Sequence, residues 1–372
     1  MLRLKLFAFI VLGLAWSPIP QAQEAACRQP QPVCDARGAV FAVSGFDPIG
    51  SAVRIAPGRL VTSRHVVADR DHVEVFLPDG NRIRAIPVPT DYLADIQLLD
   101  APDLPPGPAL TPAAAAPGDT VYTIGADIAQ GRIRAYDPGT VRLPPADARP
   151  LARLHHSAAS QPGNSGGALV DDEGRLVGIT ASGGEGRMEA VPGAAIAELQ
   201  SRSGPDRADA SSEIGAAIRI CTLKLEEMRT TRGTLPPEEA KALETSCRRT
   251  GNRQYFDLAA QALGSRRMIA ESVALFEASL DQDPNSLNAR LGLAITFHLA
   301  GRYEAEMPHL KFLMQHIPDD MQVLRLAIQA GTWAGETAFA QAAFDRLKTI
   351  NPNLAPAAER FLNAPPPRPP QR

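Results

Sequence analysis

The sequence of 372 residues contains only four cysteines, and its basic residues do not gather into one long block. Its formal net charge is −3, which argues against nucleic acid as a main partner. No Cys and His residues are spaced as in a zinc site. We therefore expect no metal site and no cofactor. The hydrophobic fraction of 44% is ample for a buried core, and the length favours two to three domains.

Residues 1–22 have the features of a secretory signal peptide. Arg3 and Lys5 form a positive start, Leu6–Trp16 form an apolar middle, and Pro18–Ala22 precede a plausible cleavage site. The alternative is a membrane anchor, but eleven apolar residues are too few for a bilayer span, which needs about 20. We expect cleavage, export to the periplasm or the medium, and no stable membrane insertion afterwards.

Export makes the four cysteines candidates for disulfides, and four cysteines allow three pairings. Cys27 and Cys34 are close neighbours in the chain. Cys221 and Cys247 lie in two helical stretches on either side of a turn at 232–237, so antiparallel helices would bring them together. We predict the pairs Cys27–Cys34 and Cys221–Cys247; the alternative is four buried thiols.

A glycine-rich turn at 161–169 places Ser165 directly ahead of an apolar strand. Glycines reach backbone angles that other residues avoid, so such a turn can aim consecutive N–H groups into one small space. The N–H groups of Gly163 and Ser165 would then form an oxyanion hole next to the Ser165 hydroxyl. This arrangement is typical of a nucleophilic serine.

A serine hydroxyl needs a base, and the base needs a carboxylate to orient it. His65 ends an apolar strand-like run, and Asp95 opens another such run. Asp91 is a rival for the carboxylate, although it does not abut the strand. The order His65, Asp95, Ser165 is that of chymotrypsin-like proteases. Arg64 is expected to be a solvated charge.

At these residues the chain resembles the trypsin-like serine proteases, and within them the HtrA (DegP) type. The resemblance rests on these segments: 62–67, 95–99, 163–169, 50–52, 117–125 and 175–179. It covers roughly residues 38 to 200, about half of the chain. It implies a double β-barrel with the His–Asp–Ser triad in the cleft between the barrels.

The chain departs from the family pattern in two places. Asn164 stands where many secreted trypsins carry an aspartate that pairs with a newly cut N-terminus. After residue 200 nothing looks like the PDZ domain that usually follows an HtrA-type protease.

The resemblance also implies where substrate specificity resides. Ala159 corresponds to the base of the pocket beside the nucleophile, and Thr180, Ser182 and Gly183 correspond to its walls. None of these four residues is charged, and a charged substrate side chain would lose hydration there without a partner. We therefore expect cleavage after small or medium uncharged residues.

The remainder of the chain changes character after residue 200. Short apolar runs between turn signals predict the barrels within a protease domain at 23–200. A polar stretch at 201–212 is typical of a linker, and the region 213–363 has helical periodicity. The Pro-rich end at 364–372 is expected to be disordered.

The helical region repeats with a period of 34 residues, since Pro284, Pro318 and Pro352 recur at that interval. A period of 34 residues with a closing proline resembles tetratricopeptide repeats, here in degenerate form. Two fair repeats, 285–318 and 319–352, follow the second helix of an earlier one. The alternative is a generic helical bundle with coincident prolines.

The predicted fold is therefore multidomain, with an all-β double barrel followed by an all-α tetratricopeptide-like repeat domain. The predicted function is an exported serine endopeptidase that acts on proteins or peptides, with the helices docking a substrate or partner. A second hypothesis is a non-catalytic binding scaffold with an inactive protease-like domain.

Overall fold

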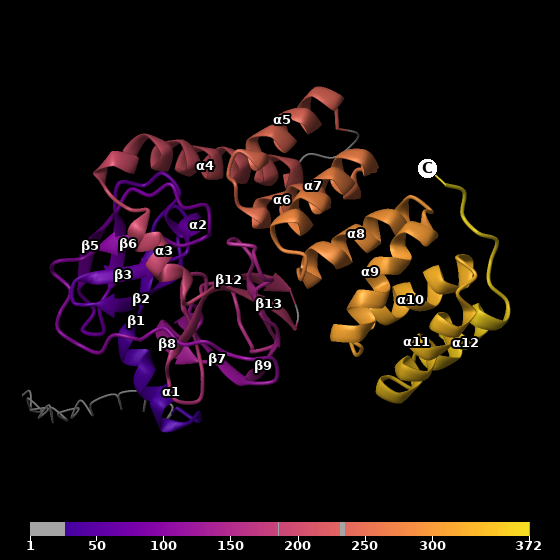
Figure 1. The fold of residues 1–372 in the computed structure, drawn as a ribbon, viewed down its shortest axis with the longest axis horizontal. Coiled ribbons are helices and arrows are strands. Elements are labelled where there is room, and N and C mark those ends of the chain that lie inside the picture. The colour runs from indigo at the N-terminus through magenta and orange to yellow at the C-terminus, as the bar shows by residue number, and fades with distance from the viewer. Residues whose placement is uncertain (1–26, 185, 231–234, 372) are drawn as a thin grey trace, which may run out of the picture.

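The computed structural model describes residues 27–184, 186–230 and 235–371. The predicted signal peptide, residues 1–22, lies outside the described residues. Figure 1 shows two β-barrels at one end of the molecule and a row of helices that leads away from them. The predicted fold class, two barrels followed by an all-α region, is confirmed.

Six antiparallel strands close the first barrel in the order β1-β2-β3-β6-β5-β4. Their bounds are Val40–Ser44, Gly50–Ala56, Arg59–Thr62, Val73–Phe76, Arg82–Pro87 and Gln97–Asp100, numbered β1 to β6. A hairpin turn around Asp79 and Gly80 joins β4 to β5. Gly80 supplies the positive φ of 86° that this turn requires.

Seven strands make the second barrel, with the order β11-β12-β13-β10-β9-β7-β8. Their bounds are Thr120–Asp127, Arg132–Ala135, Gly139–Leu143, Leu154–His156, Ala168–Val170, Leu176–Gly184 and Arg187–Pro192, numbered β7 to β13. A further pairing of β11 with β7 closes a ring of six strands, and β8 lies outside it as a partner of β7.

One apolar cluster joins the two barrels. It includes Val61 and Ile96 from the first barrel and Ile124, Ala168 and Ile179 from the second. Each of these five side chains is 0% exposed. Their burial fixes the barrels against each other, so the ends of β3 and the turn before β11 meet at a defined position.

The helices begin with α1 and end with α12. Around the barrels lie α1 (Gln31–Ala36), α2 (Arg64–Val67) and α3 (Ala195–Ser201), with single 3₁₀ turns at Arg37–Ala39 and Pro205–Arg207. The others are Ala208–Thr230, Pro237–Arg248, Arg253–Ser265, Ile269–Gln282, Leu287–Leu299, Tyr303–His316, Met321–Trp333, Thr337–Ile350 and Ala355–Asn363, numbered α4 to α12.

The helices from α6 onward repeat at the interval seen in the sequence. Helices α6, α8, α10 and α12 begin at residues 253, 287, 321 and 355, each 34 residues after the one before. Helices α7, α9 and α11 begin at 269, 303 and 337, again 34 residues apart. The array therefore includes α6 as the first helix of the early repeat, of which the sequence had indicated only the second.

The turns within the successive helix pairs also match. Arg267, Gly301 and Gly335 stand 34 residues apart and have φ values of +63°, +70° and +78°. A left-handed residue ends a helix by satisfying its last carbonyl groups, and glycine adopts that conformation most readily. An arginine takes the glycine position in the first pair, which explains why the sequence pattern is weaker there.

Two segments differ from the sequence-based expectation. Helix α4 begins at Ala208, inside the predicted linker at 201–212, and the linker's N-terminal part contacts the first barrel through a Thr90–Ser203 bridge. The Pro-rich end is held against the helices, because Trp333 donates a hydrogen bond to the carbonyl of Pro366 and Arg368 pairs with Glu304. Local composition indicated neither contact, since both depend on distant partners.

The four cysteines pair as predicted. Cys27 bonds to Cys34 at the start of the described chain. Cys221 on α4 bonds to Cys247 on α5, and both are fully buried. The second disulfide therefore joins the helix that lies against the first barrel to the helix that precedes the repeats.

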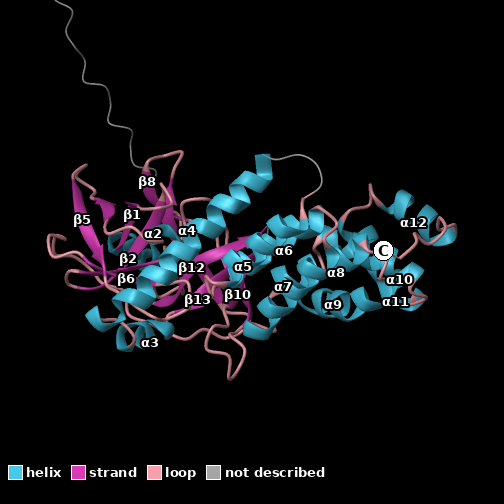
Figure 2. Cartoon of the chain, turned by 90° about the horizontal axis from the view of Figure 1, so that it is seen from above, coloured by secondary structure: helices cyan, strands magenta, loops and turns pink. Residues whose placement is uncertain are grey.

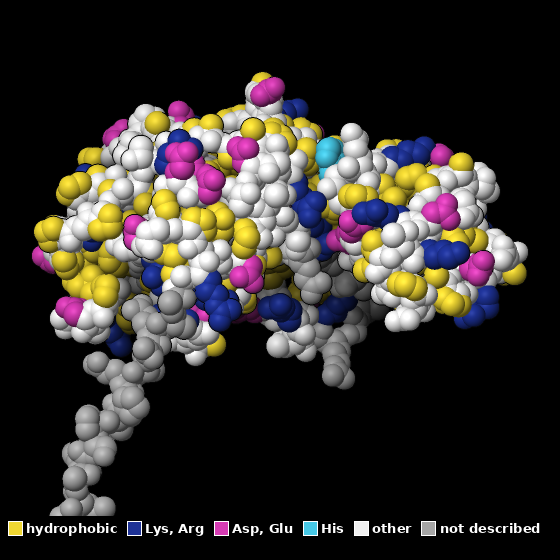
Figure 3. Space-filling model, turned by 90° about the horizontal axis from the view of Figure 1, so that it is seen from below, with side chains coloured by type: hydrophobic (Ala, Val, Ile, Leu, Met, Phe, Trp, Pro, Cys, Tyr) yellow, Lys and Arg dark blue, Asp and Glu magenta, His cyan; other side chains and the backbone are white. Residues whose placement is uncertain are grey.

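The helices contact the barrels along one side. Helix α4 lies over the first barrel near α2, and α6 to α8 lie beside the second barrel, as Figures 1 and 2 show. Within the described part of the chain, no helix combines the length and the apolar character that a membrane span needs. Basic and acidic side chains are scattered over the face shown in Figure 3.

Candidate active site

His65 lies on α2, the single helical turn that follows β3. Its neighbour Arg64 is only 2% exposed and donates hydrogen bonds to the carbonyl groups of Thr90 and Ser211. Arg64 thereby ties α2 to the loop that leads to Asp95 and to helix α4. The expectation that Arg64 is a solvated charge is wrong, because its guanidinium donates to four oxygen atoms of distant segments, on Thr90, Tyr92 and Ser211.

Asp95 and His65 form a buried hydrogen-bonded pair. Asp95 Oδ2 lies 2.7 Å from His65 Nδ1, and Oδ1 accepts the main-chain N–H of His65 at 3.1 Å. The Asp95 side chain is 0% exposed and that of His65 is 9% exposed. Asp91, the rival carboxylate, instead pairs with Arg202 and Arg207. The structure thus places Asp95, and not Asp91, beside the imidazole.

The electrostatics of this pair favour the imidazolium. Burial lowers the pKa of His65, but the Asp95 carboxylate outweighs burial and raises the pKa above its ordinary value of 6.5. Burial raises the pKa of Asp95, but the charge and hydrogen bond of His65, together with Arg153, hold it below its ordinary value of 3.8. A carboxylate that stabilises a protonated imidazole in this way suits a base that must take up a proton.

The Ser165 turn is held by residues on both barrels. Ser51 of the first barrel donates its hydroxyl to the Gly163 carbonyl at 2.7 Å, and its N–H bonds to the Ser165 carbonyl at 2.8 Å. Asn164 is 1% exposed, and its side-chain oxygen accepts the N–H of Gln161. The neutral Asn164 therefore shapes the turn from inside.

Gly166 explains how closely the turn approaches the histidine strand. Its φ is +82°, and a Cβ there would lie 2.3 Å from Thr62 Oγ1 and 2.6 Å from the Ser63 nitrogen. Only a glycine fits this close to Thr62 and Ser63. Ser63 lies two residues before His65 in the chain. Any larger residue at 166 would push Ser165 away from α2.

The amide groups of the turn divide into two sets. The N–H groups of Asn164, Gly166 and Gly167 donate to main-chain carbonyls. Among the described residues, the N–H groups of Gly163 and Ser165 have no acceptor. These are the two donors that the sequence predicts for an oxyanion hole. Within the described part of the chain, the Ser165 hydroxyl makes no hydrogen bond to His65. Of the predicted triad, His65 and Asp95 are therefore hydrogen-bonded to each other, and Ser165 lies on a separate turn.

Ser165 opens into a cavity of about 810 Å³ between the second barrel and the helices. On the barrel side, Thr180, Ser182 and Gly183 are among the residues that line it. Ala159 is exposed and is not among the lining residues, so the structure does not place it at the base of this cavity.

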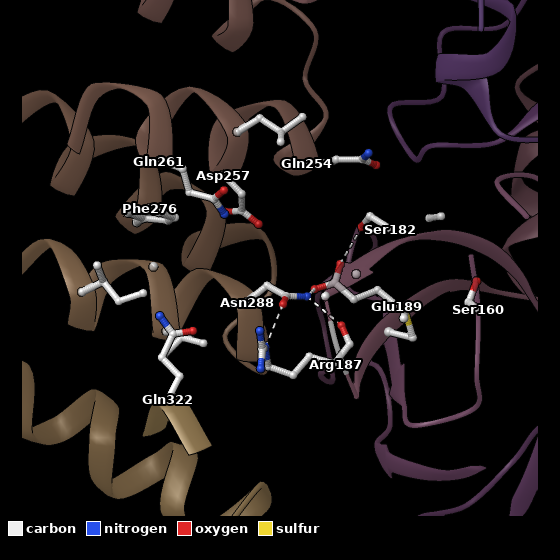
Figure 4. A pocket seen from close by; sticks show the side chains of 18 of the residues that line it. Ser160, Ser182, Arg187, Glu189, Gln254, Asp257, Gln261, Phe276, Asn288 and Gln322 are labelled. Atoms are coloured by element: carbon white, nitrogen blue, oxygen red, sulfur yellow. Dashed lines mark hydrogen bonds between the residues drawn. The ribbon is translucent and has the colours of Figure 1, made fainter. Parts of the chain in front are cut away.

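Helices α6, α7, α8 and α10 form the opposite wall of the cavity. Figure 4 shows Gln254, Asp257 and Gln261 from α6 facing Ser182 and Glu189 across the cavity. The sequence did not indicate this wall, because nothing in a repeat pattern specifies what the array packs against.

Charged side chains also line the cavity, and the sequence analysis missed them. Glu189 is 2% exposed on β13 and Arg187 lies two residues earlier. A glutamate inside the apolar run 188–191 was the signal that could have revealed it. His156 is 1% exposed, and its two ring nitrogens have no hydrogen-bond partner in the described structure. Burial, and then the neighbouring His155, lower the pKa of His156 to about 3, so its ring is neutral.

No metal is suggested by the geometry. Across the residues that the structure describes, no three or more His, Cys, Asp or Glu side chains gather as a metal ion requires.

Comparison with known proteins gives one family match. Residues 50–179 match the family model of the trypsin-like peptidase domain. This range contains His65, Asp95 and Ser165. It ends before β13 and before the helices from α3 onward.

Similar curated proteins include bacterial serine endoproteases. Serine endoprotease DegS of Salmonella typhimurium is 36% identical over 131 residues, which are 33% of this chain and 36% of that protein. The probable periplasmic serine endoprotease DegP-like of Pseudomonas fulva is 34% identical, over 34% of this chain and 28% of that protein. The chain thus spans about a third of the length of the curated relatives it matches.

A solved structure described as the HtrA-type protease AlgW with tripeptide is 32% identical to this chain. The match covers 46% of this chain and 61% of the solved chain, with a TM-score of 0.41.

The His65–Asp95 pair makes a prediction that does not depend on activity. In Asp95→Asn, the pKa of His65 should fall below 6.5, because burial still disfavours the imidazolium while the carboxylate that outweighed burial is gone. NMR titration of the His65 ring protons measures this pKa. The matched control is Asp71→Asn, since Asp71 bonds to His72 and not to His65. An unchanged His65 titration in Asp95→Asn would contradict the assignment.

Proposed function

We propose that this protein is an exported serine endopeptidase that hydrolyses peptide bonds with Ser165 as nucleophile, His65 as base and Asp95 as the orienting carboxylate. The observation that carries the proposal is the buried 2.7 Å bond between His65 Nδ1 and Asp95 Oδ2. It comes with a serine turn that packs against the residues leading into His65. The similarity of residues 50–179 to trypsin-like peptidase domains supports the same chemistry.

The proposed reaction proceeds in two steps. His65 takes the proton of the Ser165 hydroxyl as the oxygen attacks the scissile carbonyl, and it then gives that proton to the leaving amine. An acyl-enzyme remains, which water hydrolyses by the same route in reverse. The unpaired N–H groups of Gly163 and Ser165 are the donors for the negative oxygen that develops in both steps. Asp95 stabilises the imidazolium that forms in between.

Replacement of the nucleophile tests this assignment. Ser165→Ala should abolish casein hydrolysis and labelling by a fluorophosphonate probe, because no other oxygen is positioned to form the acyl-enzyme. The circular dichroism spectrum should not change, since the Ser165 side chain makes no hydrogen bond within the described residues.

Ser265→Ala is the matched control, because Ser265 lines the same cavity and its hydroxyl bonds to the Ala262 carbonyl of its own helix. Labelling should persist in that variant. Equal hydrolysis by Ser165→Ala and the unmodified protein would overturn the proposal. The alternative function, a non-catalytic binding scaffold, predicts instead that the unmodified protein reacts with no fluorophosphonate.

We infer a preference for small or medium uncharged residues before the scissile bond. Thr180, Ser182 and Gly183 beside Ser165 carry no charge. The carboxylate of Glu189 is nearby, but Arg153 and Arg253 both donate to its Oε2, and Asn288 donates to its Oε1. The Asp257 carboxyl across the cavity has one oxygen without a hydrogen-bond partner in the described structure, but burial raises its pKa to about 7 and Arg253 lies 3.5 Å from its other oxygen. A basic substrate side chain beside Ser165 would therefore lose its hydration with little compensation.

A peptide library checks this preference. Cleavage should be concentrated after uncharged residues such as Ala, Val or Ser. The measurement is mass spectrometry of the cleaved pool from the unmodified protein, with the Ser165→Ala pool as background. A profile dominated by Arg, Lys or Glu would contradict the inference.

We also propose that the helices are tetratricopeptide-like repeats that dock a protein substrate or a partner. The support is the 34-residue recurrence of the helix starts and the position of α6 and α8 opposite Ser165. Leu258 and Leu299 line the cavity while 40% and 46% exposed, so an extended peptide entering it would cover them. A bound segment held there has a high local concentration at the nucleophile.

Point changes test docking better than removal of residues 203–372, because that deletion also removes charged groups that pair with the barrel. Leu258→Glu and Leu299→Glu should each raise the KM for casein roughly tenfold, the loss expected for one uncovered leucine contact. The KM for a short chromogenic peptide should be the same as in the unmodified protein. Leu223→Glu on α4 is the control, since Leu223 is 49% exposed and does not line the cavity.

An unchanged KM for casein in both variants would rule out docking on this wall. Equal increases for casein and the short peptide would mean that the substitutions disturb the nucleophile instead.

Export to the periplasm is part of the proposal. Two disulfides in the structure and the similarity to a probable periplasmic serine endoprotease of Pseudomonas fulva support it. The substrates would then be peptides or proteins of that compartment.

A further inference from the structure

A buried network of charges crosses the boundary between the second barrel and the helices. On the barrel side it contains Arg153 and Glu189, which are 3% and 2% exposed, and on the helical side Arg253 and Asp283, which are 1% and 0% exposed. The network meets the cavity at Glu189, but neither Arg153 nor Arg253 lines the cavity.

Arg153 is the member of the network that reaches the proposed triad. Arg153 Nη2 lies 3.8 Å from Asp95 Oδ2, and it donates to the Asn252 side-chain oxygen at 3.1 Å. Arg153 Nη1 donates to the Ser182 hydroxyl at 2.6 Å and to the Glu189 carboxylate at 3.2 Å. Arg153 is therefore positioned by partners from both halves of the molecule.

The helical half fixes Arg153 in two further ways. Asp283 Oδ2 accepts the main-chain N–H of Arg153 at 3.1 Å, and it also accepts His155 Nε2 at 3.0 Å. Arg253 binds Glu189 Oε2 at 2.5 Å and lies 3.2 Å from Asp283. Arg253 thus neutralises Glu189, the carboxylate that competes with Asp95 for the Arg153 guanidinium, and it also balances the charge of Asp283.

The distances rank the contacts of Arg153. Its contact with Asp95 is the longest, at 3.8 Å, against 3.2 Å to Glu189. Loss of Arg253 would leave Glu189 with one cation in place of two, and buried charges attract each other strongly. The guanidinium would then shift toward Glu189, and the contact with Asp95 would be the first to weaken.

We propose that Arg253 and Asp283 of the helices are positioning residues for the active site, which hold Arg153 against Asp95 and thereby set the orientation and charge balance of the His65–Asp95 pair. The inference rests on the proposed triad. It makes the helical half a component of the catalytic centre as well as a docking surface.

The network has a defined electrostatic effect on the base. The charged groups that act on His65 are Asp95, Asp47 and Arg153, of which the first two raise the pKa of His65 and Arg153 lowers it. Arg64, although adjacent, directs its guanidinium away toward Thr90. Displacement of Arg153 should therefore raise the pKa of His65, so the neutral imidazole would be available only at higher pH.

Arg253→Met in the full chain tests the proposal with a short chromogenic peptide that does not reach the cavity wall. We expect kcat to fall roughly tenfold or more, as for a small displacement of a catalytic group, with KM little changed. The acid limb of the kcat/KM profile should move to higher pH. Arg253→Lys, which keeps the charge without the two-pronged geometry, should give a smaller loss of kcat and covers the case in which Arg253→Met does not fold.

A double-mutant cycle separates positioning from general support. In an Arg153→Met background, the further change Arg253→Met should alter kcat less than about twofold, because both residues act through the same contact with Asp95. Arg219→Gln is the matched control, since Arg219 pairs with Asp69 across the same two halves without touching the network. That variant should keep the kcat and the acid limb of the unmodified protein.

Three results would overturn the proposal: Arg253 variants that lower only the melting temperature, multiplicative losses of kcat in the double variant, or an equal loss in Arg219→Gln. NMR titration of His65 distinguishes failure of this inference from failure of the proposed function. If the unmodified protein neither reacts with fluorophosphonate nor cleaves any peptide, the proposed function fails, whereas a raised pKa of His65 in Arg253→Met still establishes the link. An unchanged His65 titration in that variant refutes the link in either case.

Discussion

The pairing of Arg253 with Glu189 is the interaction on which the arrangement of the two halves depends. Both side chains are buried at the boundary, and a buried charge without a partner costs several kcal/mol. The barrel supplies an excess carboxylate at Glu189, and α6 supplies the cation that balances it. Separation of the halves would leave both groups either unpaired or exposed to water. The boundary between barrels and helices is therefore specified by charge as well as by apolar contact.

A second constraint places the reactive groups within the barrels. The shared apolar cluster fixes the two barrels, and Gly166 allows the serine turn to touch the end of β3. Ser51 then links the turn to the first barrel through its hydroxyl and its N–H. Because α2 follows β3 at once, the geometry of His65 is set by the same contacts. Helix α4 covers α2 from the other side, where Gly215 lets the helix backbone approach Ala68.

These features give the helices two distinct relations to the barrel. Helix α4 and Arg64 support α2 from behind, through Ser211. Helices α6 and α8 face the cavity that contains Ser165. Within α6, different residues face the cavity and support the barrel. Gln254 and Gln261 face the cavity, whereas Arg253 points into the charge network.

Local patterns in the sequence determined a large part of this description. The hairpin at Gly80, the closing prolines of the helices and the cysteine pairs follow from turn chemistry, periodicity and symmetry about a turn. The same kind of reasoning selected Asp95 over Asp91, because a carboxylate that abuts a buried strand is the one that enters the core. Only the tertiary structure decided that Arg64 is buried, that the region after residue 201 is helical from Ala208, and that α6 faces Ser165. Glu189 and Arg253 lie 64 residues apart, and their pairing depends on how two separately patterned regions pack, which no local pattern encodes.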